Sequence, residues 1–411
     1  KIGDLEEAIK HEFSQDIINE ELQGKDGYTE IRNKDIYGNV INFIDKSFQH
    51  LGLTKKEMSL DDIIIKKPVV VSNPKEEIDD DWKEIEEETN HDVQAFVQML
   101  EEFIPDKSGR WIHYGLTSSD ILDTSLSLMC KESLQVVLDY ASSLIFHLSN
   151  LLQSDKSKSR ILARTHGKAA EIQTYYDIIY RWLHLLRKGY DSVLESKDKI
   201  SLGKLSGATG NYYFNTVECE HKALEQLGLK PVTSSQIIPR QHYLDYFYGI
   251  LQLVLAIEKI SYDIRIYSLD GINEMAEPFR EKQKGSSAMP HKKNPILTEN
   301  ICGLTRLYKS YFQTAIENCT TLLERDISHS SSERIIFKDA AHIVCFTIKR
   351  LEYVIKNINL ITDYAESHCK LMEDIVDSQR IMSENIKKGL SRKQAHDNQQ
   401  KIKDKLYLYS Y

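Results

Sequence analysis

The chain has 411 residues, of which 41% are hydrophobic and 28% are charged, and its formal net charge at pH 7 is −9. This length allows two or three domains, and the negative charge argues against a general nucleic-acid binder, which concentrates basic residues on one face. With only 8 prolines and 18 glycines, the chain has too few turn residues for an all-β fold.

The chain opens with its least regular part, which includes a β-branched patch at 62–71 that suggests a short strand pair or a buried loop. Beyond it, apolar residues at three- and four-residue spacings predict long helices. These helices are expected at Ser125–Leu152, Ile172–Ile200, Tyr243–Ala276, Ile296–Asn318 and Arg334–Ile361. Helices of this length bury their apolar stripe by packing lengthwise, and their wide apolar faces suggest a bundle that continues across a subunit interface.

We therefore predict an all-α fold, with an elongated central bundle of long helices flanked by smaller N- and C-terminal helical domains. The expected domains are residues 1–118, the bundle at 119–370 and a C-terminal helical domain at 371–411. The chain does not begin with Met, and we expect the C-terminal domain to be truncated.

The six cysteines are scattered without a C-x-x-C pair. They predict reduced, mostly buried thiols rather than disulfides or a zinc site. No apolar run approaches the ~18 residues of a membrane span, and the first residues lack the basic-then-apolar order of a signal peptide. We expect a soluble cytoplasmic protein.

The richest polar segment between the expected helices runs from Lys284 to Asn300. Gly285 and the two serines after it are typical of a mobile loop, and His291 to Asn294 place two cations and an amide just before the helix at Ile296. A helix N-terminus beside cations favours a carboxylate ligand. The alternative interpretation is a plain surface loop.

Four other segments are candidates for chemistry or binding. His166 in R-T-H-G, His113 in W-I-H-Y-G and His91 before Asp92 are suited to acid–base work, with a structural role as the alternative. Arg325 and Arg334 enclose several serines suited to phosphate, and the alternative there is a capping box at the start of a helix. The glycine-rich segment 206–210 lacks the Lys and the strand context of a P-loop, which excludes triphosphate binding there.

Taken in order, these segments resemble the fumarase/aspartase superfamily, whose signature loop G-S-S-x-M-P-x-K-x-N-P is present at 285–295. Within it, five stretches resemble the adenylosuccinate lyase family. They are H-Y-G-L-T-S-S-D, R-T-H-G, S-G-A-x-G, A-M-P-H-K-K-N-P and E-R-D-I-S-H-S-S-x-E-R. The resemblance implies a lyase of purine and AMP biosynthesis that removes fumarate from adenylosuccinate, giving AMP, and from the succinyl-aminoimidazole carboxamide ribotide, giving AICAR.

The resemblance also implies a homotetramer with active sites shared between subunits, no metal or other cofactor, and no nucleic-acid or membrane partner. In the implied elimination, Ser286 is the base, and His166, oriented by Glu299, is the acid. The implied substrate-binding residues are His91, Asp92, His113, Thr117, Ser118, Thr165, Gln236, Ser287, Lys292, Asn294, Asn300, Arg325, Ser330 and Arg334. Of these, Lys292, Asn294, Thr117 and Ser118 would hold the carboxylates, and Arg325, Ser330 and Arg334 the ribose and phosphate.

Some positions depart from the family pattern. Asn90 replaces a basic residue, Ile172 replaces a proline, and the family's opening Arg-Tyr-Ser segment is not found. The proposed acid and base are intact, which argues against a catalytically silent helical scaffold. His166 argues against a carboxymuconate-cycloisomerase-like enzyme, and His291 against argininosuccinate lyase, fumarase and aspartase.

Overall fold

The computed structural model describes residues 81–407 apart from 105–106, 281–282, 284 and 287. The β-branched patch at 62–71 lies outside these residues. The chain forms two compact units, the first extending to residue 126 and including 202–237, the second comprising 127–201 and everything from 238 onward.

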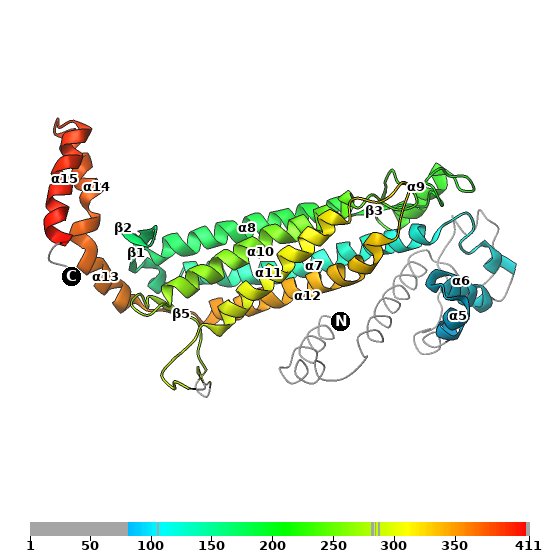
Figure 1. Ribbon diagram of the computed structural model, residues 1–411, viewed down its shortest axis with the longest axis horizontal. Coiled ribbons are helices and arrows are strands. Elements are labelled where there is room, and N and C mark those ends of the chain that lie inside the picture. The colour runs from blue at the N-terminus through cyan, green and yellow to red at the C-terminus, as the bar shows by residue number, and fades with distance from the viewer. Residues whose placement is uncertain (1–80, 105–106, 281–282, 284, 287, 408–411) are drawn as a thin grey trace. The chain divides into compact units, whose positions relative to one another are not determined.

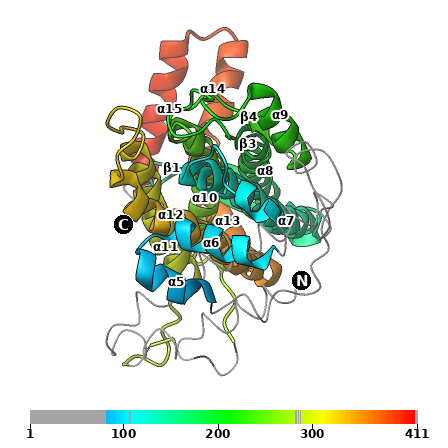
Figure 2. The ribbon, with the colours of Figure 1, turned by 90° about the vertical axis from the view of Figure 1, so that its right-hand side faces the viewer.

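The first unit is built from short elements. Its helices are α5 (Asp81–Thr89), α6 (Asp92–Phe103), the 3-10 turn η1 (Lys107–Trp111), α9 (Val217–Gln226) and the first turns of α7 (Ser118–Leu152). Strand β3 (Leu202–Gly203) pairs in parallel with β4 (Lys230–Pro231), and α9 packs beside β4 (Figure 2).

A buried ion pair joins two segments of this unit that are far apart in sequence. Lys204 donates to the carboxylate of Asp120, and both side chains are 0% exposed. The same carboxylate accepts the backbone N–H of Thr117 at 2.7 Å and that of Gly207 at 3.3 Å. The start of α7 and the glycine-rich segment are therefore held together by one carboxylate.

We expect Asp120→Ala to destabilise the protein by about 3–5 kcal/mol, because it leaves the Lys204 ammonium buried without a counter-charge. The matched control is Lys222→Ala, which breaks the ion pair to Glu218 at 2.8 Å between exposed side chains and should cost less than about 1 kcal/mol. The check is the midpoint of urea unfolding followed by circular dichroism. An Asp120→Ala midpoint equal to that of the parent protein would contradict the expected role.

The second unit is dominated by long helices. It contains the rest of α7, then α8 (Tyr175–Lys199), α10 (Gln241–Tyr267), α11 (Ile296–Glu317) and α12 (Ser328–Asn357), followed by α13 (Thr362–Val376), α14 (Ser378–Lys387) and α15 (Arg392–Tyr407). Helices α8, α10, α11 and α12 lie side by side (Figure 1). Two short antiparallel pairs complete it, β1 (Arg160–Thr165) with β2 (Lys168–Thr174) and β5 (Met275–Ala276) with β6 (Asn359–Leu360).

Buried aromatic side chains connect these helices. Trp182 on α8 donates its indole N–H to Asp263 on α10 at 2.8 Å. Tyr308 on α11 donates its hydroxyl to the carbonyl oxygen of Phe247 on α10 at 2.9 Å. Because each polar tip is satisfied, the rings can be fully buried without leaving an unpaired donor.

The prediction of a largely helical chain is confirmed, and the differences lie at helix ends. Helix α8 begins at Tyr175 rather than Ile172, because Thr174 closes a capping box with Asp177. Helix α10 ends at Tyr267, before a turn in which Gly271 has a φ of 81°, so the expected extension to Ala276 is wrong. Helix α12 begins at Ser328, six residues before the expected start at Arg334.

All six cysteines are free thiols, as predicted. Among the residues that the structure describes, no three His, Cys, Asp or Glu side chains are grouped so as to hold a metal ion. Within the same residues, every helix is too short or too polar to cross a membrane.

Candidate active site

The first unit carries the two histidines expected on the nucleotide side. His91 caps α6, where its Nδ1 accepts the backbone N–H of Gln94 at 3.3 Å, and it lies 3.6 Å from the carboxylate of Asp92. Burial lowers the pKa of His113 from its usual value, opposed by the nearby carboxylate of Asp120. The Nε2 atom of His113 is buried without a hydrogen-bond partner in the described structure. A neutral imidazole with a free nitrogen is suited to hydrogen bonding a ligand.

Three further candidates of this unit are half-buried polar residues. Thr117 and Ser118 form the N-terminus of α7, with the Thr117 N–H directed to Asp120. Gln236 lies in the segment between β4 and α10. That segment contacts the glycine-rich segment through the hydroxyls of Ser234 and Ser206, 3.1 Å apart.

His166 lies at the tip of the β1–β2 hairpin in the second unit. Thr165 pairs with Lys168, which leaves His166 and Gly167 as a two-residue turn, with φ values of 54° and 74°. Two successive positive φ values define the type I′ turn that matches strand twist. Thr165 and His166 are exposed, and the described residues offer the imidazole of His166 no hydrogen bond or ion pair. Its position depends on the hairpin alone.

The signature loop presents Ser286 on a turn of its own. The Ser286 Oγ accepts the backbone N–H groups of Ala288 at 3.3 Å and Met289 at 3.1 Å. Two N–H donors on one hydroxyl oxygen favour its alkoxide form. Asn294 donates its side-chain amide to the carbonyl of Gly285 at 3.0 Å, and Lys292 is exposed. Ser287 lies outside the described residues.

The start of α11, where the loop ends, differs from expectation. The carboxylate of Glu277 accepts the backbone N–H groups of Leu297 at 2.9 Å and Thr298 at 3.0 Å. The helix N-terminus is therefore occupied by the protein's own carboxylate, and the expectation that it holds a substrate carboxylate is wrong. Glu299 and Asn300 are exposed on the first turn. Asn300 accepts a hydrogen bond from Arg350, and no hydrogen bond joins Glu299 to His166 among the described residues.

The third group of candidates surrounds the N-terminus of α12. Arg325 is half-buried, and its Nε has no partner within the described residues. Ser330 and Arg334 lie inside the first two turns of the helix, so the capping-box alternative is wrong. The preceding turn is fixed by Asp326, which accepts the N–H of Ser328 at 2.7 Å. Hydrogen bonding to Ser328 lowers the pKa of Asp326 to about 2.

The candidates of the second unit fall at opposite ends of its bundle. Strand β6 follows α12 directly and pairs with β5, just before the loop, so the loop leaves from the C-terminal end of α12 (Figure 1). Arg325 precedes the other end of this 30-residue helix, about 45 Å away. Thr298 is held at the loop end by its hydrogen bonds to Glu277. Asn294 lies four residues before Thr298, so the chain can place Asn294 at most about 14 Å from it. The loop candidates Lys292 and Asn294 therefore cannot meet the phosphate-binding candidates Arg325 and Ser330 of the same chain.

Comparison with known proteins agrees with the pattern of motifs. A protein-family model described as lyase matches residues 28–306. The chain is 39% identical to an adenylosuccinate lyase from Thermotoga maritima, over 77% of this chain and 73% of that protein. It is 35% identical to an adenylosuccinate lyase from Bacillus subtilis over the same shares. The chain belongs to the adenylosuccinate lyase family.

The fold is also that of solved relatives. The crystal structure of a fumarate lyase from a Mesorhizobium species matches with a TM-score of 0.72 and 16% identity, covering 97% of this chain and 87% of that one. A 3-carboxy-cis,cis-muconate lactonizing enzyme from Pseudomonas putida matches with a TM-score of 0.67 and 19% identity, over 78% and 72% of the two chains. The predictions of an all-α, fumarase/aspartase-like fold and of a lyase of this family are confirmed.

Three charged residues that matter for the site were missed in the sequence: Lys204, Glu274 and Glu277. Each is buried and fixes a segment that carries a candidate residue. The sequence signal was weak, because a lone charge near a turn is usually solvated. The four-residue run Glu274-Met-Ala-Glu277, shortly before the signature loop, was the best available clue.

Proposed function

We propose that this member of the family eliminates fumarate from adenylosuccinate, giving AMP, and from the succinyl-aminoimidazole carboxamide ribotide, giving AICAR. The identity of 39% to a curated adenylosuccinate lyase over most of both chains carries the proposal. Ser286, with two backbone N–H groups on its oxygen, adds a chemical reason.

In the proposed reaction, the alkoxide of Ser286 removes the proton from the carbon beside one carboxylate of the succinyl group. The electron pair moves into that carboxylate as an aci-carboxylate, which Lys292 and Asn294 stabilise. The C–N bond then breaks to release fumarate, and His166 gives its proton to the departing nitrogen. Water must be excluded while the alkoxide exists, which gives the exposed loop a reason to close over the substrate.

We also propose that the active enzyme is a homotetramer with active sites shared between subunits. The separation of the candidates along α12 supports sharing, because a second copy can bring its α12 N-terminus to the loop end of the first. An apolar stripe supports assembly. It runs along α10 at seven-residue spacing through Tyr248, Leu255 and Tyr262, which are 38% to 49% exposed. Such a stripe buries its area against another helix.

The proposed location is the cytoplasm, which suits soluble nucleotide substrates. The proposed reaction steps use only side chains of the protein, without a cofactor. Neither a nucleic acid nor a membrane takes part in the proposed reaction.

The purified protein is expected to lower the ultraviolet absorbance of adenylosuccinate as AMP and fumarate appear, in buffer that contains a chelator. Product identity is checked by liquid chromatography, with a boiled sample as the control. If adenylosuccinate stays intact in the presence of folded protein, the proposal that it is a substrate is wrong. A need for added metal would sink the proposed mechanism.

A further inference from the structure

Glu274 is a junction between three elements of the second unit. Its side chain is 0% exposed, and its two carboxylate oxygens receive the fork of Arg164, with both N–O distances at 2.7 Å. His368 on α13 places its Nδ1 2.7 Å from one of the same oxygens. Tyr175, the first residue of α8, donates its hydroxyl to the backbone carbonyl of Glu274 at 2.7 Å.

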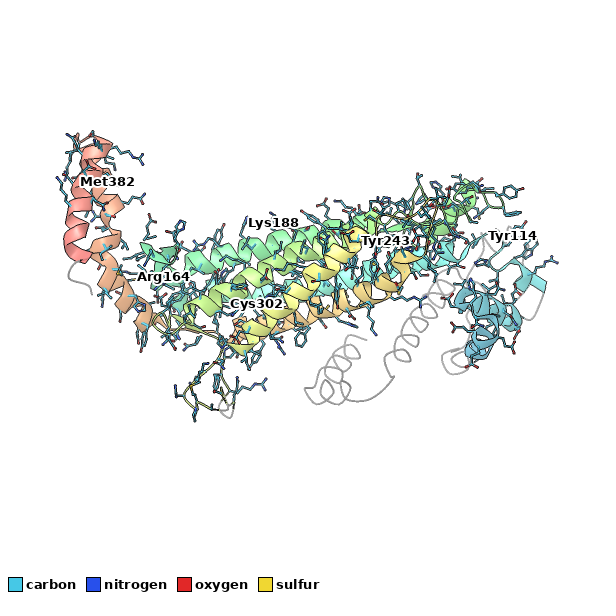
Figure 3. All side chains as sticks on the ribbon, viewed as in Figure 1. Tyr114, Arg164, Lys188, Tyr243, Cys302 and Met382 are labelled. Carbon is cyan, nitrogen blue, oxygen red and sulfur yellow. The ribbon has the colours of Figure 1, made fainter. Side chains whose placement is uncertain are left out.

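This arrangement is placed to control the hairpin that carries His166. Arg164 lies two residues before His166 on β1, about 7 Å along the strand, at the end of the bundle where β1 meets α13 (Figure 3). A β-bulge beside Arg164 shifts the register of the hairpin at this point. The imidazole of His166 has no hydrogen bond or ion pair within the described residues, and the Arg164 fork is a buried side-chain contact two residues before the turn that carries it.

We infer that Glu274, Arg164 and His368 are positioning residues for the acid of the reaction, a role that rests on the proposed function of His166. The carboxylate fixes the angle of the hairpin, and through it the distance from the imidazole to the departing nitrogen. A misplacement of about 1 Å can cost on the order of 10²-fold in rate. Glu274 also precedes β5 and the signature loop. One buried carboxylate therefore connects the hairpin that carries the acid His166 to the segment that leads into the loop with the base Ser286.

The chain offers a matched pair of variants. Arg164→Lys keeps the positive charge but loses the planar fork, so it cannot engage both oxygens of Glu274. Arg160 lies on the same strand and also reaches α13, through Glu373 at 3.0 Å, but at the far end of the hairpin and partly exposed. We expect Arg164→Lys to lower kcat by roughly 10- to 100-fold with little change in KM. Arg160→Lys should keep kcat within about twofold of the parent.

A double variant separates positioning from a general loss of structure. If Arg164 acts through His166, the Arg164→Lys/His166→Ala protein should be no slower than His166→Ala alone. Multiplied defects in the double variant, or normal kcat in Arg164→Lys, would overturn the inference. Circular dichroism and the oligomeric state of each variant must match those of the parent, and Glu274→Gln, whose amide still accepts one hydrogen bond, should give the same kinetic pattern.

Failure of this inference is distinguishable from failure of the proposed function. A nearly inactive His166→Ala beside a fully active Arg164→Lys overturns the positioning role alone. A fully active His166→Ala overturns the assignment of the acid, and the positioning role with it.

Discussion

His166→Ala and Ser286→Ala are each expected to lower kcat by roughly 10²- to 10⁴-fold, the range that positioned acids and bases contribute. The two losses have different causes. Without His166 the departing nitrogen leaves as an unprotonated anion, and without Ser286 no group removes the proton that starts the elimination. Neither change disturbs the core, because His166 is exposed and Ser286 is only partly buried on its loop.

The measurement is steady-state turnover of adenylosuccinate at saturating substrate, beside the far-ultraviolet circular dichroism of each variant. His396→Ala is the control, since His396 is 67% exposed on α15 and is absent from every candidate segment. Near-normal turnover in either variant would remove that residue from its proposed role while leaving the family assignment intact.

The variant Ser286→Cys adds a finer test of the base. The alkoxide form of a serine is favoured only while the backbone N–H groups of Ala288 and Met289 point at its oxygen. Ser286→Cys keeps a donor atom at this position with a far lower intrinsic pKa. We expect it to retain more activity than Ser286→Ala, measured by the same assay.

The long helices could be predicted from the sequence because their apolar residues recur at helical spacing over many turns. The β1–β2 hairpin could not. Its turn uses His166 and Gly167, where Asn-Gly is the usual type I′ pair, and the bulge beside Arg164 breaks the alternation that marks a strand.

The sequence motifs predicted which residues belong to the site, but not the buried charged residues that hold the site segments in place. Lys204 pairs with a residue 84 positions earlier in the chain, and Glu274 with one 110 positions earlier. Residues this far apart leave no periodic pattern in the sequence. The residue type alone also does not distinguish a buried charged side chain from a solvated one. The occupied N-terminus of α11 shows the consequence. The sequence placed cations beside a helix start, and only the structure shows that Glu277 fills it.

Co-expression of two inactive variants is expected to restore activity. The pair is His166→Ala, changed at the hairpin, and Arg325→Ala/Arg334→Ala, changed at the start of α12. In a mixed oligomer, the His166→Ala chain has an intact α12 N-terminus, and the Arg325→Ala/Arg334→Ala chain has an intact hairpin. A site that joins the hairpin of the second variant to the α12 N-terminus of the first has every candidate residue. With random mixing, roughly a quarter of the sites should combine two intact halves.

The length of α12 makes this result follow from geometry. The loop and the Arg325 region lie at its two ends, about 45 Å apart along a 30-residue helix, so one chain cannot close both around a single nucleotide. The matched control is a mixture of His166→Ala and His166→Asn, which share the same defect and should stay inactive. Restored turnover in the first mixture alone supports sites shared between subunits. No recovery in co-purified mixed oligomers would mean that each site is built from one chain, and the proposed sharing would have to be abandoned.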